Sequence, residues 1–387
     1  MLTITTGIWN VASNLADPYF SLYILALGGS YFDIGLTSAV GNLLMIIPLV
    51  FAGSLTDVIG RKRLVVGFGY ALAVSYIIYA QAPSWQFLLL GQAATSLIHG
   101  FRSPAFSSIV ADSTRSENRA FSIALWQRIP QAIRLASPLL GGYLIDQLGI
   151  IPAMRLFYIF TFIACLIAHI LRHKYLRETL STLQNQVVEG LKKTIRELKT
   201  LPNHVSQQAL YLIWINALLH LASMTANAYW VVYATGELGG LTASEWGVAT
   251  LFHDFILIVF SIIFGFAADK FGKFKFVFIS FILTPIAITL FPTRQGFLEI
   301  LIIRSMFGLL TSLRTAAFSA LFIDYSPQMF RGRLNAFQRL ASRPMVIIGN
   351  LLGGLLYQQV SAPAPFYVYA GVLGITGIVF YLLMKDS

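Results

Sequence analysis

Long apolar runs constrain this chain more than any other feature of its sequence. They recur from end to end, with short polar turns between them. A run of about 20 apolar residues can cross the hydrocarbon core of a bilayer, roughly 30 Å thick, as an α-helix. Only 11% of the residues are charged, whereas soluble domains carry roughly 25%. The sequence therefore predicts an all-α integral membrane protein.

The breaks between the runs predict twelve transmembrane helices. Charged residues, glycines and prolines mark these breaks. The predicted spans are residues 4–27, 33–55, 64–82, 85–110, 120–144, 153–171, 208–235, 244–267, 275–292, 297–322, 333–357 and 366–384.

Lysine and arginine lie mainly in alternate loops. One set of loops holds most of them, including Arg61–Arg63, Lys192, Lys193 and Arg172, whereas the other holds only Arg155 and Arg294. By the positive-inside rule the first set is cytoplasmic. Both termini are therefore predicted to lie on the cytoplasmic side of the cell membrane. This topology accounts for the net charge of +11, and no nucleic-acid partner is predicted.

A polar stretch separates the first six spans from the last six. In residues 173–206, leucine, isoleucine and valine recur at helical spacing among charged residues. This pattern predicts an amphipathic helix at the cytoplasmic surface, either a plain linker or a docking helix for a partner, and the linker is the simpler interpretation. The predicted domains are residues 1–172, 173–206 and 207–387.

The two halves of the chain repeat at a constant offset. GSLTDVIGRKR at residues 53–63 aligns with GFAADKFGKFK at residues 265–275, which is 212 residues later. The same offset aligns further residues, namely Arg102 with Arg314, Asp112 with Asp324, Arg119 with Arg331, and Gly141 and Gly142 with Gly353 and Gly354. The chain is therefore predicted to be a parallel duplication of a six-helix bundle, an architecture that favours a transporter working by alternating access.

GSLTDVIGRKR resembles the loop signature that the major facilitator superfamily carries between its second and third spans. That signature runs glycine, any residue, leucine, a small residue, aspartate, a basic residue, any residue, glycine and two basic residues. Val58 departs where a cation is expected. The matching residues are Gly53, Leu55, Asp57, Gly60, Arg61 and Lys62, and the second copy keeps Gly265, Asp269, Lys270, Gly272 and Lys273. The resemblance implies this fold over essentially the whole chain.

A carboxylate at the inner end of span two, followed by a glycine turn and cations, can form a clasp. Asp57 would accept hydrogen bonds from arginines or from amides at a helix N-terminus. The resemblance implies that such a clasp stabilises the outward-facing state, with Asp112 and Arg119, and Asp324 and Arg331, completing it. Alternatively, the charges only set orientation. The candidate gate residues are Gly53, Asp57, Gly60, Arg61, Lys62, Arg63, Asp112, Arg119, Gly265, Asp269, Gly272, Lys273, Asp324 and Arg331. The first copy is predicted to carry the lock and the second to mark the inside.

SPLLGG at residues 137–142 resembles the span-five element of the antiporters of the superfamily, many of which export drugs. Ser137 replaces the first glycine of that element. Ordinary close packing of small residues is the alternative interpretation. An arginine that exporters carry early in span four is replaced by Gln92, whereas the matching place in span ten holds Arg304.

Ionisable residues inside the spans are functional candidates, because charge is costly in the hydrocarbon layer. Asp17, Asp254 and His253 are candidates for proton coupling, since a desolvated carboxylate can take up a proton near neutral pH. The resemblance implies that spans one, four, seven and ten line a central cavity, which favours Asp17 and span seven for substrate contact. The candidates for substrate or proton coupling are Asp17, Asn14, Arg102, Arg128, Arg134, His220, Asn227, Trp230, His253, Asp254, Arg304, Arg314 and Arg339. The arginines among them either pair with carboxylates, which is favoured, or receive an anionic substrate.

The sequence predicts a secondary transporter that exports small organic or drug-like molecules, with protons as the coupling ion. The alternative is an uptake or exchange carrier for an organic anion or another polar metabolite. An enzyme is not predicted, because neither a zinc-protease motif nor a phosphate-binding loop is found. No cofactor or metal is predicted, and the chain is expected to act as a monomer in the lipid bilayer.

Overall fold

The computed structural model describes residues 1–114, 126, 128–180, 205–236 and 239–385, without the side chains of residues 49, 50, 53, 54, 57 and 328. The chain forms two compact units. Unit 1 comprises Met1–Gly29 and Val40–Arg196, and unit 2 comprises Ser30–Ala39 and Glu197–Ser387. Unit 1 thus differs from the predicted domain 1–172, because it omits residues 30–39 and extends beyond residue 172. Most of the predicted amphipathic segment, residues 181–204, lies outside the described residues.

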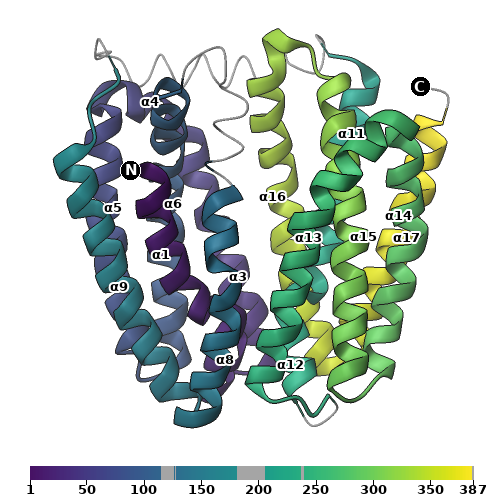
Figure 1. The fold of residues 1–387 in the computed structure, drawn as a ribbon, viewed down its shortest axis with the longest axis horizontal. Helices are drawn as coiled ribbons and strands as arrows, with labels where there is room; N and C mark the ends of the chain where they lie inside the picture. The colour runs from purple at the N-terminus through teal and green to yellow at the C-terminus, as the bar shows by residue number, and fades with distance from the viewer. Residues whose placement is uncertain (115–125, 127, 181–204, 237–238, 386–387) are drawn as a thin grey trace. The chain divides into compact units, whose positions relative to one another are not determined.

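Unit 1 is built from helices that run side by side (Figure 1). In chain order they are α1 (Leu2–Ala16), η1 (Asp17–Tyr19), α2 (Phe20–Ala26), α4 (Ile46–Ile59), α5 (Arg61–Ala80), α6 (Trp85–Asp112), η3 (Arg134–Ala136), α8 (Ser137–Leu148) and α9 (Ile150–Tyr175). The helix α3 (Tyr31–Leu44) begins in the residues of unit 2 and ends in those of unit 1. Within unit 1, α5 packs against α6 and α9, and α1 packs against α8 and α9.

Unit 2 has a similar sequence of elements (Figure 1). They are α11 (Gln207–Ala226), η5 (Asn227–Tyr229), α12 (Trp230–Thr235), α13 (Ala243–Phe271), α14 (Lys273–Leu290), η6 (Phe291–Thr293), α15 (Phe297–Asp324), η7 (Gln328–Phe330), α16 (Arg331–Leu355), the π-helix η8 (Leu356–Val360) and α17 (Ala364–Met384). Here α13 packs against α15, α11 against α16 and α17, and α14 against α15 and α17.

The helices have the length and composition of membrane spans. Among the described residues, nine helical runs are long and apolar enough to cross a membrane. Three further runs of the chain, α1–α2, α6 and α8, are also helical. This arrangement is consistent with the twelve predicted spans. The buried side chains are mainly apolar, and many large apolar side chains are also exposed on the outer surface, as expected where lipid replaces water.

Both units interrupt their first helix at a corresponding place. In unit 1 the interruption is the 3₁₀ turn Asp17–Tyr19, and in unit 2 it is the 3₁₀ turn Asn227–Tyr229. Pro18 explains the first break, because proline has no N–H for the helical hydrogen bond and crowds the preceding turn. The duplication seen in the sequence therefore extends to a local irregularity of the backbone.

Candidate functional site

A cavity of about 460 Å³ lies within unit 1. Its aromatic lining comes from Trp9, Phe20, Tyr76, Tyr79 and Tyr158. Its polar lining comes from three helices and two 3₁₀ turns, and includes Asn10, Ser13, Asp17, Asn42, Gln92, Thr95, Ser96, His99 and Arg134. A concave site with aromatic walls and a few polar groups is the usual form of a small-molecule site.

Asp17 is the carboxylate of this cavity. The break after α1 sets it at the first residue of η1, and its side chain is exposed to the cavity. Arg134, also in the lining, directs its Nη1 to Asn14 Oδ1 at 2.8 Å. Within the described residues, Asp17 forms no ion pair within 4 Å. The predicted pairing of in-span arginines with Asp17 is therefore not made by Arg134, whose guanidinium binds a neutral amide instead.

One wall of the cavity is stiffened by hydrogen bonds between aromatic residues. Trp9 Nε1 donates to Tyr76 Oη at 3.1 Å, and the ring of His99 meets Trp9 edge-on at 5.7 Å. Tyr79 Oη donates to Gln92 Oε1 at 3.1 Å, so Gln92 fixes an aromatic side chain of the cavity.

Behind this wall, two buried arginines meet at one histidine. Arg102 is 3% exposed and Arg172 is fully buried. Their Nη1 atoms lie 3.1 Å and 3.2 Å from His169 Nε2. His169 Nδ1 lies 2.7 Å from the carbonyl oxygen of Cys165, so Nδ1 carries the proton and Nε2 accepts from both guanidinium groups.

Sequence reasoning missed the role of Arg172. It was assigned to a cytoplasmic loop, but α9 extends to Tyr175 and buries Arg172 against Thr5 and Thr6, to which it also donates. The signal that could have found it is the spacing of His169 and Arg172, which lie on the same face of a helix at i and i+3.

Unit 2 holds a second group of candidates between α13 and α15. His253 Nδ1 lies 2.8 Å from Asp254 Oδ1. Arg304 is 7% exposed, and its guanidinium carbon lies 4.9 Å and 5.0 Å from the ring centres of Trp230 and Trp246. Trp230 is itself buried among Phe291, Phe307 and Phe366.

The remaining in-span candidates are more dispersed. Arg314 is buried in α15, whereas Asn227 and Arg339 are exposed and His220 is half-buried. Arg128 is exposed and donates to Gln131 Oε1 at 3.2 Å.

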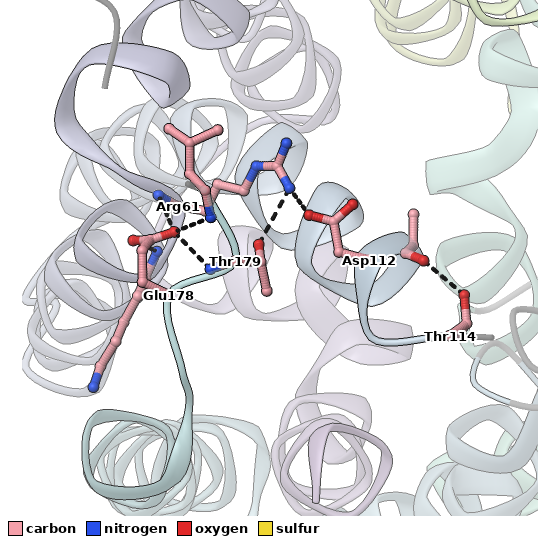
Figure 2. A network of polar contacts seen from close by, with 8 residues as sticks. Arg61, Asp112, Thr114, Glu178 and Thr179 are labelled. Carbon is pink, nitrogen blue, oxygen red and sulfur yellow. Dashed lines mark hydrogen bonds and ion pairs between the residues drawn. The ribbon is translucent and has the colours of Figure 1, made fainter. Parts of the chain in front are cut away.

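The first copy of the loop motif forms a polar network (Figure 2). Gly60 has φ +95°, a conformation that favours glycine, and it joins α4 to α5. Arg61, the first residue of α5, forms an ion pair with Asp112 at the end of α6 and donates to Thr179 Oγ1 at 3.2 Å. The side chain of Asp57 and all of Arg119 lie outside the described residues, so their predicted parts in the clasp stay predictions.

Glu178 completes this network and had no sequence signal, because it lies far along the chain from the motif. Its carboxylate accepts hydrogen bonds from the backbone N–H groups of Arg61 and Lys62, at 3.2 Å and 2.9 Å, and thereby caps α5 (Figure 2). The N–H groups of Thr179 and Leu180 also donate to it. Partial burial raises the pKa of Glu178, but these four N–H groups together outweigh it and hold the pKa below its usual value.

The second copy repeats the ion pair. Gly272 has φ +102°, and Lys273 Nζ lies 2.7 Å from Asp324 Oδ2 and 3.3 Å from Asp269 Oδ1. Among the described residues, the ion pair of Asp324 is made by Lys273 and not by Arg331, the other residue predicted to complete the clasp. Arg331 donates to the carbonyl oxygens of Ser326 and Ile323, at 3.1 Å and 3.4 Å, beyond and within the last turn of α15. An ion pair is thus present at both copies, and the prediction that only the first acts as a lock stays a prediction. Of the remaining gate candidates, Arg63 is exposed and Gly265 has no atom near the position of a Cβ.

Two duplicated helical units, one with a polar cavity deep among its spans, define a membrane transporter. The chain belongs to the major facilitator superfamily, whose family model matches residues 2–235 and 212–387. It is 23% identical to the multidrug resistance protein MdtG of Dickeya zeae, over 97% of this chain and 91% of the relative. It is 24% identical to the quinolone resistance protein NorA of Staphylococcus aureus, over 96% and 92%. A POT family transporter solved with a thioalcohol-conjugated peptide shares the fold, with a TM-score of 0.78, 10% identity and coverage of 100% and 96%.

Proposed function

We propose that this transporter exports amphipathic, drug-like cations in exchange for protons, acting as a monomer by alternating access. The observation that carries the proposal is the carboxylate of Asp17, which is exposed to the unit 1 cavity and has no ion-pair partner among the described residues. A carboxylate in a membrane interior is costly unless it binds a cation or a proton. Asp17 can hold a substrate ammonium group or a proton, but not both at once.

This competition supplies a coupling mechanism. When a proton binds Asp17 the ammonium group is released, and when the ammonium group binds the proton must leave. Exchange of one singly charged cation for one proton moves no net charge across the membrane. The coupled exchange is therefore expected to respond to a pH gradient and not to a membrane potential.

The walls of the cavity support the substrate class. Trp9, Phe20 and Tyr158 offer flat apolar surfaces, which bind aromatic and aliphatic groups of differing shape. The relatives named for multidrug and quinolone resistance support the same class.

His253 and Asp254 form a second candidate for proton binding, in unit 2. Asp254 differs from Asp17 because it already has a partner, the Nδ1 of His253 at 2.8 Å. We therefore assign substrate exchange to Asp17 and treat Asp254 as an accessory site whose loss lowers transport less.

Transport by purified protein in liposomes tests the proposal. With an acidic interior, a lipophilic cation should accumulate inside, and a proton ionophore should abolish the accumulation. Asp17→Asn should abolish it as well, whereas Glu299→Gln, which changes an exposed acid that pairs with Arg294 at 4.0 Å, should not. Exchange of organic anions without protons, with no cation transport, would instead support the alternative carrier and overturn this proposal.

A further inference from the structure

We propose that the unit 1 cavity selects substrates with two unlike ends, an ammonium group at the Asp17 end and an anionic group at the Trp9 end. This inference rests on the proposed export function and changes its substrate from a singly charged cation to a zwitterionic amphiphile. Because a zwitterion carries no net charge, its exchange for one proton would move one positive charge across the membrane, so this exchange would respond to a membrane potential as well as to a pH gradient.

The two ends are defined by one helix face. Trp9 and Asp17 both line the cavity and are eight positions apart along α1 and the start of η1. At a rise of 1.5 Å per residue they are separated by about 12 Å along the helix axis. Ser13, which also lines the cavity, lies midway between them on the same face.

The Trp9 end is positively charged. The guanidinium carbon of Arg102 lies 5.3 Å from the centre of the Trp9 ring, directly behind the wall. Within the described residues, Arg102 has no carboxylate partner within 4 Å, and its buried Nε has no hydrogen-bond acceptor. His99, one turn before Arg102, lines the cavity and also has a buried ring nitrogen without a partner, Nδ1.

The contacts of Arg102 preserve this charge. Its Nη1 donates to His169 Nε2, a neutral nitrogen that is also bound by Arg172. An arginine remains protonated in proteins, and a neutral acceptor does not cancel its charge. Arg102 therefore keeps its charge directly behind the Trp9 wall, and Arg172 donates to the same histidine nitrogen.

The Asp17 end also contains a cation, Arg134. Because Arg134 Nη1 donates to Asn14 and forms no ion pair with Asp17 within the described residues, the carboxylate stays available. A ligand with a single positive charge gains attraction at this end but is repelled at the other. A ligand with both charges, about 12 Å apart, gains at both ends.

Binding of a matched ligand series to the purified full-length protein tests this inference. The series consists of straight-chain ω-amino acids of increasing length, each with its methyl ester, which keeps only the ammonium group, and its N-acetyl derivative, which keeps only the carboxylate. Dissociation constants are measured by calorimetry at neutral pH. The amino acid should bind about tenfold more tightly than either derivative, equivalent to roughly 1.4 kcal/mol. Its affinity should peak at the chain length that spans about 12 Å.

Variants assign the two ends. Arg102→Gln should remove the preference for the amino acid over its ester, whereas Arg102→Lys should keep it, since the charge is retained. Asp17→Asn should weaken the binding of the amino acid and of the ester, but not the binding of the N-acetyl derivative. If Arg102→Gln fails to fold, the ligand series measured with the wild type and with Arg102→Lys still tests the inference.

Equal binding of all three forms, or an affinity that simply rises with chain length, would overturn the inference. That result together with proton-driven cation export would leave the proposed function intact. Conversely, the protein could prefer zwitterions and yet transport no substrate in response to a pH gradient. That result would contradict proton-driven export and support the two-ended binding site.

Discussion

Gly141 in α8 lies against the main chain of α1, so that a Cβ at position 141 would be 2.5 Å from the carbonyl oxygen of Leu15. The same relationship recurs in unit 2, where a Cβ at Gly353 would be 2.2 Å from the carbonyl oxygen of Thr225. The ring of a tyrosine, Tyr19 or Tyr229, lies beside each glycine. These contacts explain Gly141 of SPLLGG and its counterpart Gly353 as sites of close helix approach, and each contact lies within one turn of a helix break.

Gly141→Ala is expected to destabilise the protein by about 1–3 kcal/mol, because backbone must move to make room for the methyl group. Thermal unfolding in detergent should show a lower midpoint. Gly371→Ala in α17 is the matched control, since nothing lies within 4 Å of a Cβ there. The control should unfold at the wild-type temperature or slightly above it, because alanine favours helix more than glycine does. Equal effects at the two positions would contradict the packing argument.

Arg61→Lys is expected to keep most of the wild-type transport rate, whereas Arg61→Gln is expected to lower it. The reason is that unit 2 uses Lys273 for the equivalent contact with Asp324. Lysine can therefore replace the ion pair with Asp112, although it loses the hydrogen bond to Thr179. Uptake rates in liposomes measure this, and Lys275→Gln serves as a control because Lys275 is an exposed cation outside the candidate gate residues. Equal losses in the lysine and glutamine variants would show that the charge is not what matters.

Glu178→Gln is expected to lower the unfolding temperature at neutral pH, by an amount corresponding to about 0.5 kcal/mol, the lower range for a helix cap. The folded state holds the pKa of Glu178 below its usual value. Its contribution is therefore complete above the pKa of the unfolded chain and is lost as the pH falls through the lower folded value. The difference between wild type and variant should shrink on acidification. A difference that grows in acid would reverse the sign and exclude this cap.

His169→Ala is expected to destabilise the protein by about 3 kcal/mol or more, because it leaves donors of two buried guanidinium groups without their shared acceptor. Tryptophan fluorescence should also change, since Arg102 lies beside Trp9. His173→Ala is the control, because His173 is exposed and contacts only the ring and hydroxyl of Tyr70 among the described residues. Wild-type stability and fluorescence in the alanine variant at 169 would show that the arginines find other acceptors.

Much of the fold could be predicted because membrane spans are local. Length, apolarity and cation placement indicate each helix from its own residues, and the constant offset of 212 revealed the duplication. Asp17 was also found locally, as a carboxylate inside an apolar run. Contacts between distant segments could not be found this way. Glu178, which lies three residues beyond α9, caps the start of α5, and Lys273 forms the ion pair with Asp324. Arg172 was misassigned because a cation near a helix end can either point to water or fold back into the interior. The sequence alone does not determine which direction the side chain takes.

The paired helix breaks at Asp17 and Asn227 make the two halves of this chain a natural experiment on a single charge. The units share the irregularity of the backbone and the tyrosine two residues later, yet only the first carries an acid at that place. Exchanging the two side chains, with Asp17→Asn and Asn227→Asp in one protein, would relocate a carboxyl group while leaving composition and net charge unchanged. After duplication, one substitution at such a position is enough to make the two units differ. The break in one unit can then bind a cation, whereas the break in the other carries no charge.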